Sequence, residues 1–274
     1  MHMQRIMLFF VCFSFLTLAA QAQEEETMLR EGLALINQGK YQESIRKNEE
    51  VIKKYPKSHV AFNNIGLAYY YLDEMDKSID FLKKSIAVNA DYGLAHANLS
   101  KMLFLEDRYE ESLKHANRSI QIGGSQSDLA LYVKGRILLD QGNAEAAIEM
   151  FKDAIKIDGE YRDAYFWRGY AYVSLQKYEM AILDYDRVVR LDPNHSMTYN
   201  NRGYCYMEGP QNYDRAMSDF NKALELDPDN HQAVNNRAFI LHEQGKKEEA
   251  CKEWQRAIKM GNKNAQNLYN DYCN

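Results

Sequence analysis

A period of about 34 residues runs through this chain and constrains its fold more than any other feature. A small residue recurs along it, each time 34 or 35 positions after the last, at Gly32, Gly66, Ser100, Gly135, Gly169, Gly203 and Ala238. Self-similarity at this period indicates a row of similar structural units, each contacting its neighbours, rather than one globular core. The sequence therefore predicts seven units.

The units share further marks, which are clearest in the fifth and sixth. An aromatic residue comes four positions before the small residue, another comes three positions after it, an alanine begins a second helix and a proline ends the unit. These residues are Tyr165, Tyr172, Ala181 and Pro193 in the fifth unit, and Tyr199, Tyr206, Ala216 and Pro228 in the sixth. A small residue lets two helices approach closely, apolar residues at helical spacing fill the contact, and proline cannot continue a helix. Each unit is predicted to be a helix–turn–helix.

These marks resemble the tetratricopeptide repeat family over residues 25–262. The resemblance implies an all-α fold, a right-handed α-solenoid of about seven repeats occupying residues 23–262. The first and third repeats are degenerate, because Asn48 takes a large apolar position and Ser100 replaces the small glycine. One residue is inserted near Gly209 and Pro210, which should lengthen the turn inside repeat six.

Residues 1–22 have the features of a cleaved secretory signal peptide. His2 and Arg5 precede an apolar run over residues 6–20, and Ala20 and Ala22 flank a glutamine at the expected cleavage site before Gln23. The alternative is an uncleaved anchor, although the run is shorter than the roughly 18 to 20 residues that a membrane-spanning helix needs. We expect an exported protein, periplasmic or secreted, with no membrane span after cleavage, similar to exported bacterial proteins of this repeat family.

The resemblance also implies where a partner binds, since first helices of the repeats line a concave wall that usually holds a protein or extended peptide. On this register the groove residues are Asn63, Leu67, Tyr70, Tyr71, Phe104, Tyr132, Arg136, Phe166, Tyr170, Asn200, Tyr204, Asn235, Phe239 and His242. Aromatic rings supply contact area at low entropic cost, and amides can pair with a peptide backbone. The alternative is that about half of these rings pack between repeats.

Two partner classes fit poorly. The net charge is −5 with both signs interspersed, so no basic face invites nucleic acid. Repeats that hold acidic chaperone tails use a lysine, asparagine and arginine clamp, because a carboxylate needs charge-assisted donors. The matching positions here are Leu29, Leu33, Asn64, Leu94 and Asn98.

Signatures of catalysis, metal binding and cofactor binding are missing from the sequence. The stretch from His242 to Lys246 begins like a zinc-protease helix but has lysine where the second histidine ligand belongs. Gly123 and Gly124 lack the further glycines and the lysine of a phosphate-binding loop. We expect no catalytic residues, no metal and no cofactor.

The end of the chain is predicted to cap the array, because the last repeat otherwise exposes an apolar face. Residues 263–274 can form a short helix antiparallel to the one before it, and this would bring Cys251 and Cys273 to a similar height. The two cysteines can then form a disulfide, or remain two separately buried thiols. Cys205 is expected to be a small buried residue.

Two functions from different classes follow. The first is an exported protein–protein interaction scaffold without catalysis of its own, and the alternative is a periplasmic holding chaperone or targeting factor for exported proteins. An enzyme would need a catalytic constellation that the sequence does not contain.

Overall fold

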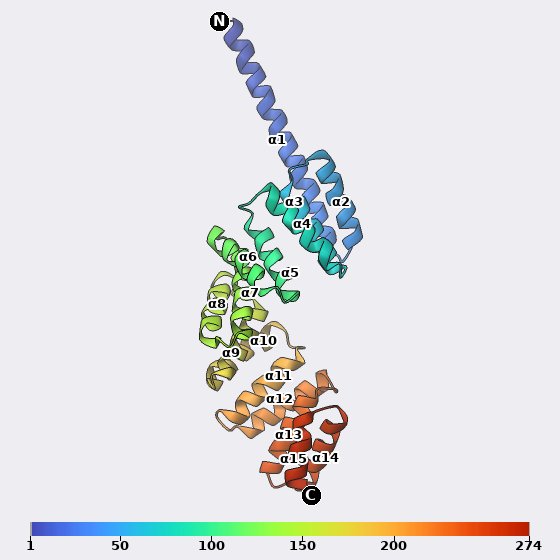
Figure 1. The fold of residues 1–274 in the computed structure, drawn as a ribbon, viewed down its shortest axis with the longest axis vertical. Helices are drawn as coiled ribbons and strands as arrows, with labels where there is room; N and C mark the ends of the chain where they lie inside the picture. The colour runs from blue at the N-terminus through green and yellow to red at the C-terminus, as the bar shows by residue number, and fades with distance from the viewer. Residues whose placement is uncertain (1, 274) are drawn as a thin grey trace. The chain divides into compact units, whose positions relative to one another are not determined.

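The protein is described by a computed structural model, which covers the backbone of residues 2–273 and the side chains of residues 20–273. The described residues form fifteen α-helices and no strand, which confirms the all-α class (Figure 1). Two compact units divide the chain, with unit 1 over residues 1–133 and unit 2 over residues 134–274, so that the division falls inside α7. Most of the predicted signal peptide, residues 1–22, lies outside the described side chains.

The helices come in pairs along the chain. Unit 1 contains α1 (His2–Asn37), α2 (Tyr41–Lys54), α3 (His59–Tyr71), α4 (Met75–Val88), α5 (Gly93–Leu105), α6 (Tyr109–Ile122) and the start of α7 (Ser127–Asp140). Unit 2 contains the rest of α7, then α8 (Ala144–Ile157), α9 (Arg162–Ser174), α10 (Tyr178–Leu191), α11 (Ser196–Glu208), α12 (Tyr213–Leu226), α13 (His231–Glu243), α14 (Lys247–Lys259) and α15 (Lys263–Cys273).

Packing within each unit is between neighbours in sequence. The two helices of a pair contact each other, as α9 contacts α10, and a second helix contacts the first helix of the next pair, as α10 contacts α11. First helices also contact the next first helix, α1 with α3 and α3 with α5 in unit 1, and α9 with α11 and α11 with α13 in unit 2. In unit 2, α9, α11 and α13 therefore lie side by side, and we call the surface that they share the inward face of this unit.

The recurrent small residue makes room for a large side chain on the second helix of the same pair. A Cβ atom added to Gly135 would lie 2.7 Å from Cε1 of Phe151, and one added to Gly203 would lie 2.8 Å from Cε1 of Phe220. Real Cβ atoms do not approach other atoms so closely, so the close approach predicted from the sequence is confirmed. The last repeat has the same arrangement, with buried Trp254 opposite Ala238 in the register.

In the two degenerate repeats, polar side chains fill the contact between the two helices of the pair. In the third, Ser100 and Ser112 are both buried, and the Ser112 hydroxyl donates to the carbonyl of Ser100 at 2.7 Å. In the first, buried Asn48 donates to the carbonyl of Ser44 at 2.9 Å and accepts from the amide of Asn64 at 3.3 Å. Since buried polar groups are paired, these substitutions leave the repeat intact.

The turn inside each repeat uses one residue in the left-handed region of backbone space. These residues share a positive φ and recur at the repeat period, at Gly39, Asp73, Asp107, Gly142, Gln176, Gln211 and Gly245. In repeat six, the connection between the two helices is four residues long, between Glu208 and Tyr213. In the other six pairs it is three residues long. The predicted lengthening of this turn is confirmed.

Turns between repeats begin with a side-chain hydrogen bond. Asp192 follows the last residue of α10, and its carboxylate accepts from the backbone N–H of Asn194 at 3.1 Å. Asp227 does the same after α12, accepting from the N–H of Asp229 at 3.0 Å. The helix ends predicted from Pro193 and Pro228 are therefore confirmed.

Candidate functional site: a groove in unit 2

A cavity of about 580 Å³ opens on the inward face of unit 2. It is lined by Tyr170 and Val173 of α9, Tyr185 of α10, Asn200, Asn201 and Tyr204 of α11, His231, Gln232, Asn235 and Asn236 of α13, and residues 261–264 at the start of α15. A second cavity of about 270 Å³ shares Tyr204, Asn235, Asn236 and Asn264 with it and adds Met207, Glu208, Phe239 and Leu268. We call the two cavities together the unit 2 groove.

Asparagine pairs form the floor of this groove because of their place in the repeat. Asn200 and Asn201 come three and two residues before Gly203, and Asn235 and Asn236 hold the same positions before Ala238. The amide of Asn236 donates to Oδ1 of Asn200 at 3.3 Å, and the amide of Asn200 donates to Oδ1 of Asn201 at 3.1 Å. These bonds connect neighbouring repeats and fix the orientation of the amides.

Two buried polar atoms on the groove lack a hydrogen bond of normal geometry. They are Oδ1 of Asn235 and the hydroxyl oxygen of Tyr185. Asn235 is only 7% exposed and Tyr185 is fully buried. Both atoms are covered by neighbouring atoms, so neither is exposed on the surface of the groove.

Two of the groove tyrosines, Tyr185 and Tyr204, remain protonated at neutral pH. Burial raises the pKa of Tyr185 well above its ordinary value, and burial also raises the pKa of Tyr204. Both phenols can therefore donate a hydrogen bond, and neither carries a negative charge toward a ligand.

The larger cavity has no carboxylate among its lining residues, although the chain as a whole is acidic. Its ionisable side chains other than tyrosine are Lys263 and His231. Lys263 is exposed, and ring atom Nδ1 of His231 lies 3.1 Å from the amide nitrogen of Asn262. This charge distribution suits a neutral or acidic ligand better than a basic one.

The structure brings five of the residues predicted for the groove together in unit 2. Tyr170, Asn200, Tyr204 and Asn235 line the larger cavity, and Phe239 lines the smaller one. Tyr170 is the most exposed of these, at 46%.

Three other predicted residues of unit 2 lie outside both cavities. Phe166 is buried in the core, with its ring edge-on to His195 at 5.1 Å. His242 packs on Tyr272 of α15 at 4.2 Å. The guanidinium carbon of Arg136 lies 3.4 Å from the ring centre of Trp167.

The remaining predicted residues belong to unit 1 and do not line the unit 2 groove. Asn63 is buried and accepts a hydrogen bond from Asn98 at 2.9 Å, so its carbonyl oxygen connects two repeats. Tyr71 is half exposed and stacks on Tyr41 at 5.0 Å. Leu67, Tyr70, Phe104 and Tyr132 are partly buried.

Several groove residues were missed by the sequence reasoning. Asn201 and Asn236 were detectable, because a doubled asparagine precedes the small residue in three repeats, at residues 63–64, 200–201 and 235–236. Asn262, Lys263 and Asn264 were not, because they follow the last repeat and have no place in its register.

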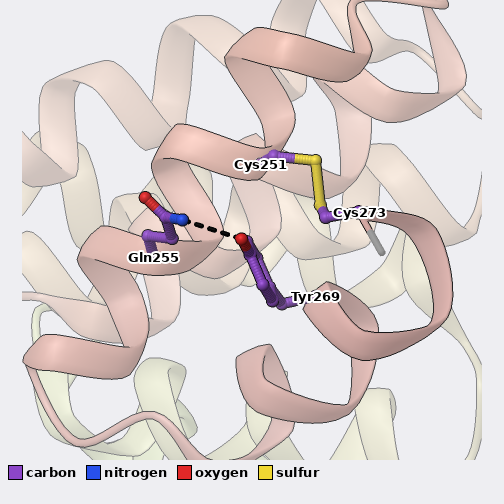
Figure 2. Close-up of a disulfide and its surroundings, with 4 residues drawn as sticks. All are labelled: Cys251, Gln255, Tyr269 and Cys273. Atoms are coloured by element: carbon purple, nitrogen blue, oxygen red, sulfur yellow. Dashed lines mark hydrogen bonds between the residues drawn. A yellow bond between two sulfur atoms is a disulfide. The ribbon is translucent and has the colours of Figure 1, made fainter.

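The last helix is fastened to the repeat before it by a disulfide between Cys251 of α14 and Cys273 of α15, whose Cα atoms lie 5.8 Å apart (Figure 2). One helical turn further along α14, the amide of Gln255 donates to the hydroxyl of Tyr269 at 2.8 Å. Cys205 is a free, buried thiol, and burial raises its pKa to about 12.

Two other kinds of site are absent from the described residues. Within the described part of the chain, no three His, Cys, Asp or Glu side chains are grouped so that they could hold a metal ion. Among the described residues, no helix combines the length and the apolar character needed to cross a membrane.

Curated relatives share the repeats over part of their length. The chain is 27% identical over 140 residues to the mitochondrial import receptor subunit TOM70 of Rattus norvegicus, which is 50% of this chain and 23% of that protein. It is 30% identical over 155 residues to a UDP-N-acetylglucosamine–peptide N-acetylglucosaminyltransferase of Giardia intestinalis, covering 54% of this chain and 10% of the enzyme. The chain thus spans less than a quarter of either relative.

Solved structures show the same fold. The pilF protein of Pseudomonas aeruginosa superposes with a TM-score of 0.71 at 14% identity, over 78% of this chain and 96% of that one. A tetratricopeptide repeat protein of Parabacteroides merdae gives a TM-score of 0.57 at 17% identity, over 92% of this chain and all of that one. YrrB, a repeat protein described as having an unusual peptide-binding site, gives 0.54 at 17% identity, over 68% of this chain and 95% of its own.

Family models agree with the period, the helix pairs and the close contacts inside them. Models of the tetratricopeptide repeat match residues 29–92, 132–196, 198–230 and 220–252. Together these segments cover most of the chain and both units, and this chain belongs to the tetratricopeptide repeat family.

Proposed function

We propose that this protein is an exported protein–protein interaction scaffold that binds an extended segment of a partner in the unit 2 groove and catalyses no reaction itself. Repeat proteins of this family bind proteins or peptides, which is the general part of the proposal. The observation that carries the specific part is the pair of cavities on unit 2 that are lined by asparagine amides and tyrosines.

The chemistry of the groove matches a peptide backbone. An asparagine side chain both donates and accepts hydrogen bonds, as a peptide backbone does, so the two can pair. Asn201 and Asn236 offer further amide groups, while Tyr170 and Tyr204 offer ring surface for side chains. With Lys263 at one end and no carboxylate in the larger cavity, the bound segment is neutral or acidic.

Export is supported by separate features. The apolar run and small residues within residues 1–22 are typical of a secretory signal, and a disulfide between Cys251 and Cys273 is typical of proteins in oxidising compartments. We therefore propose a periplasmic or secreted location.

A selection from random peptides tests the binding proposal. The purified protein is used to enrich phage-displayed dodecapeptides, and an enriched peptide is labelled and titrated by fluorescence anisotropy. Tyr170→Ala should weaken binding roughly tenfold, as truncation of a central aromatic contact does. Asn235→Ala should weaken binding as well.

The chain offers a matched control for this experiment. Met180 on α10 is 46% exposed, like Tyr170, but lines neither cavity, so Met180→Ala should bind the peptide as the unchanged protein does. Equal effects of the two substitutions, or no enriched peptide, would contradict the proposal. Enrichment of many unrelated sequences with micromolar affinity would instead favour the holding-chaperone alternative.

A further inference from the structure

The last helix takes part in the groove as well as in capping the array. Asn262, Lys263 and Asn264 line the larger cavity, and Asn264 and Leu268 line the smaller one. The helix α15 contacts α14, and its residues Leu268 and Tyr269 pack on the core of the last repeats. It therefore forms the end wall of the groove beside α13.

Most side chains of α15 are exposed or only partly buried. Ala265 is the buried side chain of α15, and a methyl group supplies little apolar area. Asn262 accepts from the N–H of Ala265 at 3.0 Å and donates to the carbonyl of His231 at 3.0 Å, which fixes the start of the helix. An isolated helix shorter than about 12 residues is marginal in water, so α15 depends on its attachment.

At its other end, α15 is attached by the hydrogen bond from Gln255 to Tyr269, by contacts of Tyr272 with His242 and Trp254, and by a disulfide. Tyr272 stacks on Trp254 at 5.8 Å but is itself 39% exposed, so this contact excludes water only in part. Cys273 is bonded to Cys251 of α14, which joins the free end of the chain covalently to the last repeat (Figure 2).

We propose that the Cys251–Cys273 disulfide is a redox lock on the unit 2 groove, holding α15 as the end wall in the oxidised protein and releasing it on reduction. This inference rests on the proposed binding function of the same groove. It adds that affinity for the partner segment depends on the oxidation state of these two cysteines.

The chemistry of release is thiol–disulfide exchange with a dithiol reductant. A thiolate of the reductant attacks one sulfur, the Cys251–Cys273 bond breaks, and a mixed disulfide forms. The second thiolate of the reductant resolves this intermediate. Two electrons and two protons pass to the protein, which ends with two thiols, while the reductant ends as a disulfide.

The protein's third described cysteine does not interfere. Both bridged residues are only partly buried and so can be reached, whereas Cys205 is fully buried on α11. Exchange with Cys205 would require its repeat to open, so reduction acts on the single bond at the end of the chain.

Two measurements on the purified protein test the lock, with dithiothreitol as the reductant. Hydrogen exchange of residues 263–273 should become faster on reduction, while exchange in α9 and α11 stays the same. Affinity for the selected dodecapeptide should fall roughly tenfold, because the fraction of molecules with a complete groove falls. The variant with Cys251→Ser and Cys273→Ser should behave like the reduced protein and not respond to dithiothreitol, and Cys205→Ser should respond as the unchanged protein does.

The outcomes separate the lock from the function on which it rests. An oxidised protein that binds no peptide overturns the proposed function. An oxidised protein that binds, and whose affinity is the same after complete reduction, overturns the lock alone. Unchanged exchange of residues 263–273 on reduction also overturns the lock.

Discussion

Gly169 on α9 faces Tyr185 on α10, and a Cβ atom on the glycine would lie 2.8 Å from Cε1 of the tyrosine ring. The tyrosine crosses the contact between the two helices, and it lines the groove. One residue pair thus connects the packing of a repeat to its candidate binding site. A glycine is needed at position 169 because any larger residue would clash with the ring of Tyr185.

A methyl group at this position should destabilise the protein. Gly169→Ala forces Tyr185 or α10 to shift, and overpacking of this kind costs about 1 to 3 kcal/mol of unfolding free energy. Urea denaturation followed by circular dichroism measures the change, and peptide affinity should fall as Tyr185 moves.

Gly159 provides the control for that substitution. It lies in the turn after α8, and a Cβ there would meet nothing within 4 Å. Gly159→Ala should change the unfolding free energy by no more than about 0.5 kcal/mol. Similar losses for the two variants would show that the Gly169 contact is not tight.

A histidine pair in unit 1 should make stability depend on pH. Nδ1 of His96 lies 2.9 Å from Nδ1 of His115, and Nε2 of His96 lies 3.2 Å from the carbonyl of Ala90. A carbonyl only accepts, so Nε2 of His96 carries its proton and its Nδ1 accepts from His115. The bond between the rings requires that at least one of the two rings is neutral, because two protonated rings would both present donors.

Burial lowers the pKa of both rings, and the pKa of His115 falls to about 4. The surrounding charges are Lys83, Asp91, Glu111, Lys114 and Arg118. The histidines of the unfolded chain take up protons near pH 6.5, while the folded pair does not. The folded protein therefore has its full free energy of unfolding above about pH 6.5, and this free energy decreases as the pH falls toward 4. Stability should decrease by up to about 1.4 kcal/mol per pH unit for each ring.

His115→Gln tests this pair, because a glutamine amide can still donate to His96 but does not titrate. Urea denaturation at pH 7 and pH 5 should show a smaller loss for the variant than for the unchanged protein. The remaining loss is assigned to other histidines whose pKa burial lowers, such as His59 and His195. Identical losses would contradict the role of His115, and its pKa can be read directly by NMR titration.

The thiol content of the denatured, unreduced protein tests the disulfide and the signal peptide together. With residues 1–22 removed and Cys251 bonded to Cys273, labelling should find one reactive thiol, that of Cys205, and the intact mass should correspond to residues 23–274. A second reactive thiol with the mass of the full chain would show that Cys12 and the leader are retained. Three reactive thiols on the processed chain would contradict the disulfide.

The fold was predictable from the sequence because its signals are local and repeated. Spacing of the small residues located the helix pairs, and Asp192 and Asp227 before prolines located the helix ends. The partners of the small residues were harder to foresee, since Asn48 and Ser100 depart from the pattern and are accommodated by hydrogen bonds that depend on side-chain geometry.

The groove was only partly predictable, because helical register fixes a side chain's direction but not what covers it. Tyr170 and Tyr204, which the register predicts for the groove, line the larger cavity. The register does not indicate which rings pack on Phe166, or that Tyr272 packs on His242. The wall contributed by α15 depends on a helix outside the repeat, for which the period carries no information.

Photo-crosslinking in the native host tests the central claim, that the unit 2 groove holds a partner segment, most directly. A photoreactive phenylalanine analogue replaces Tyr170 in one strain and Met180 in another, and captured peptides are identified by mass spectrometry. Position 170 should capture a defined extended segment of a partner protein. Position 180, which is equally exposed but lies outside the groove, should not. Capture of the same partners at both positions, or capture only at position 180, would contradict the central claim.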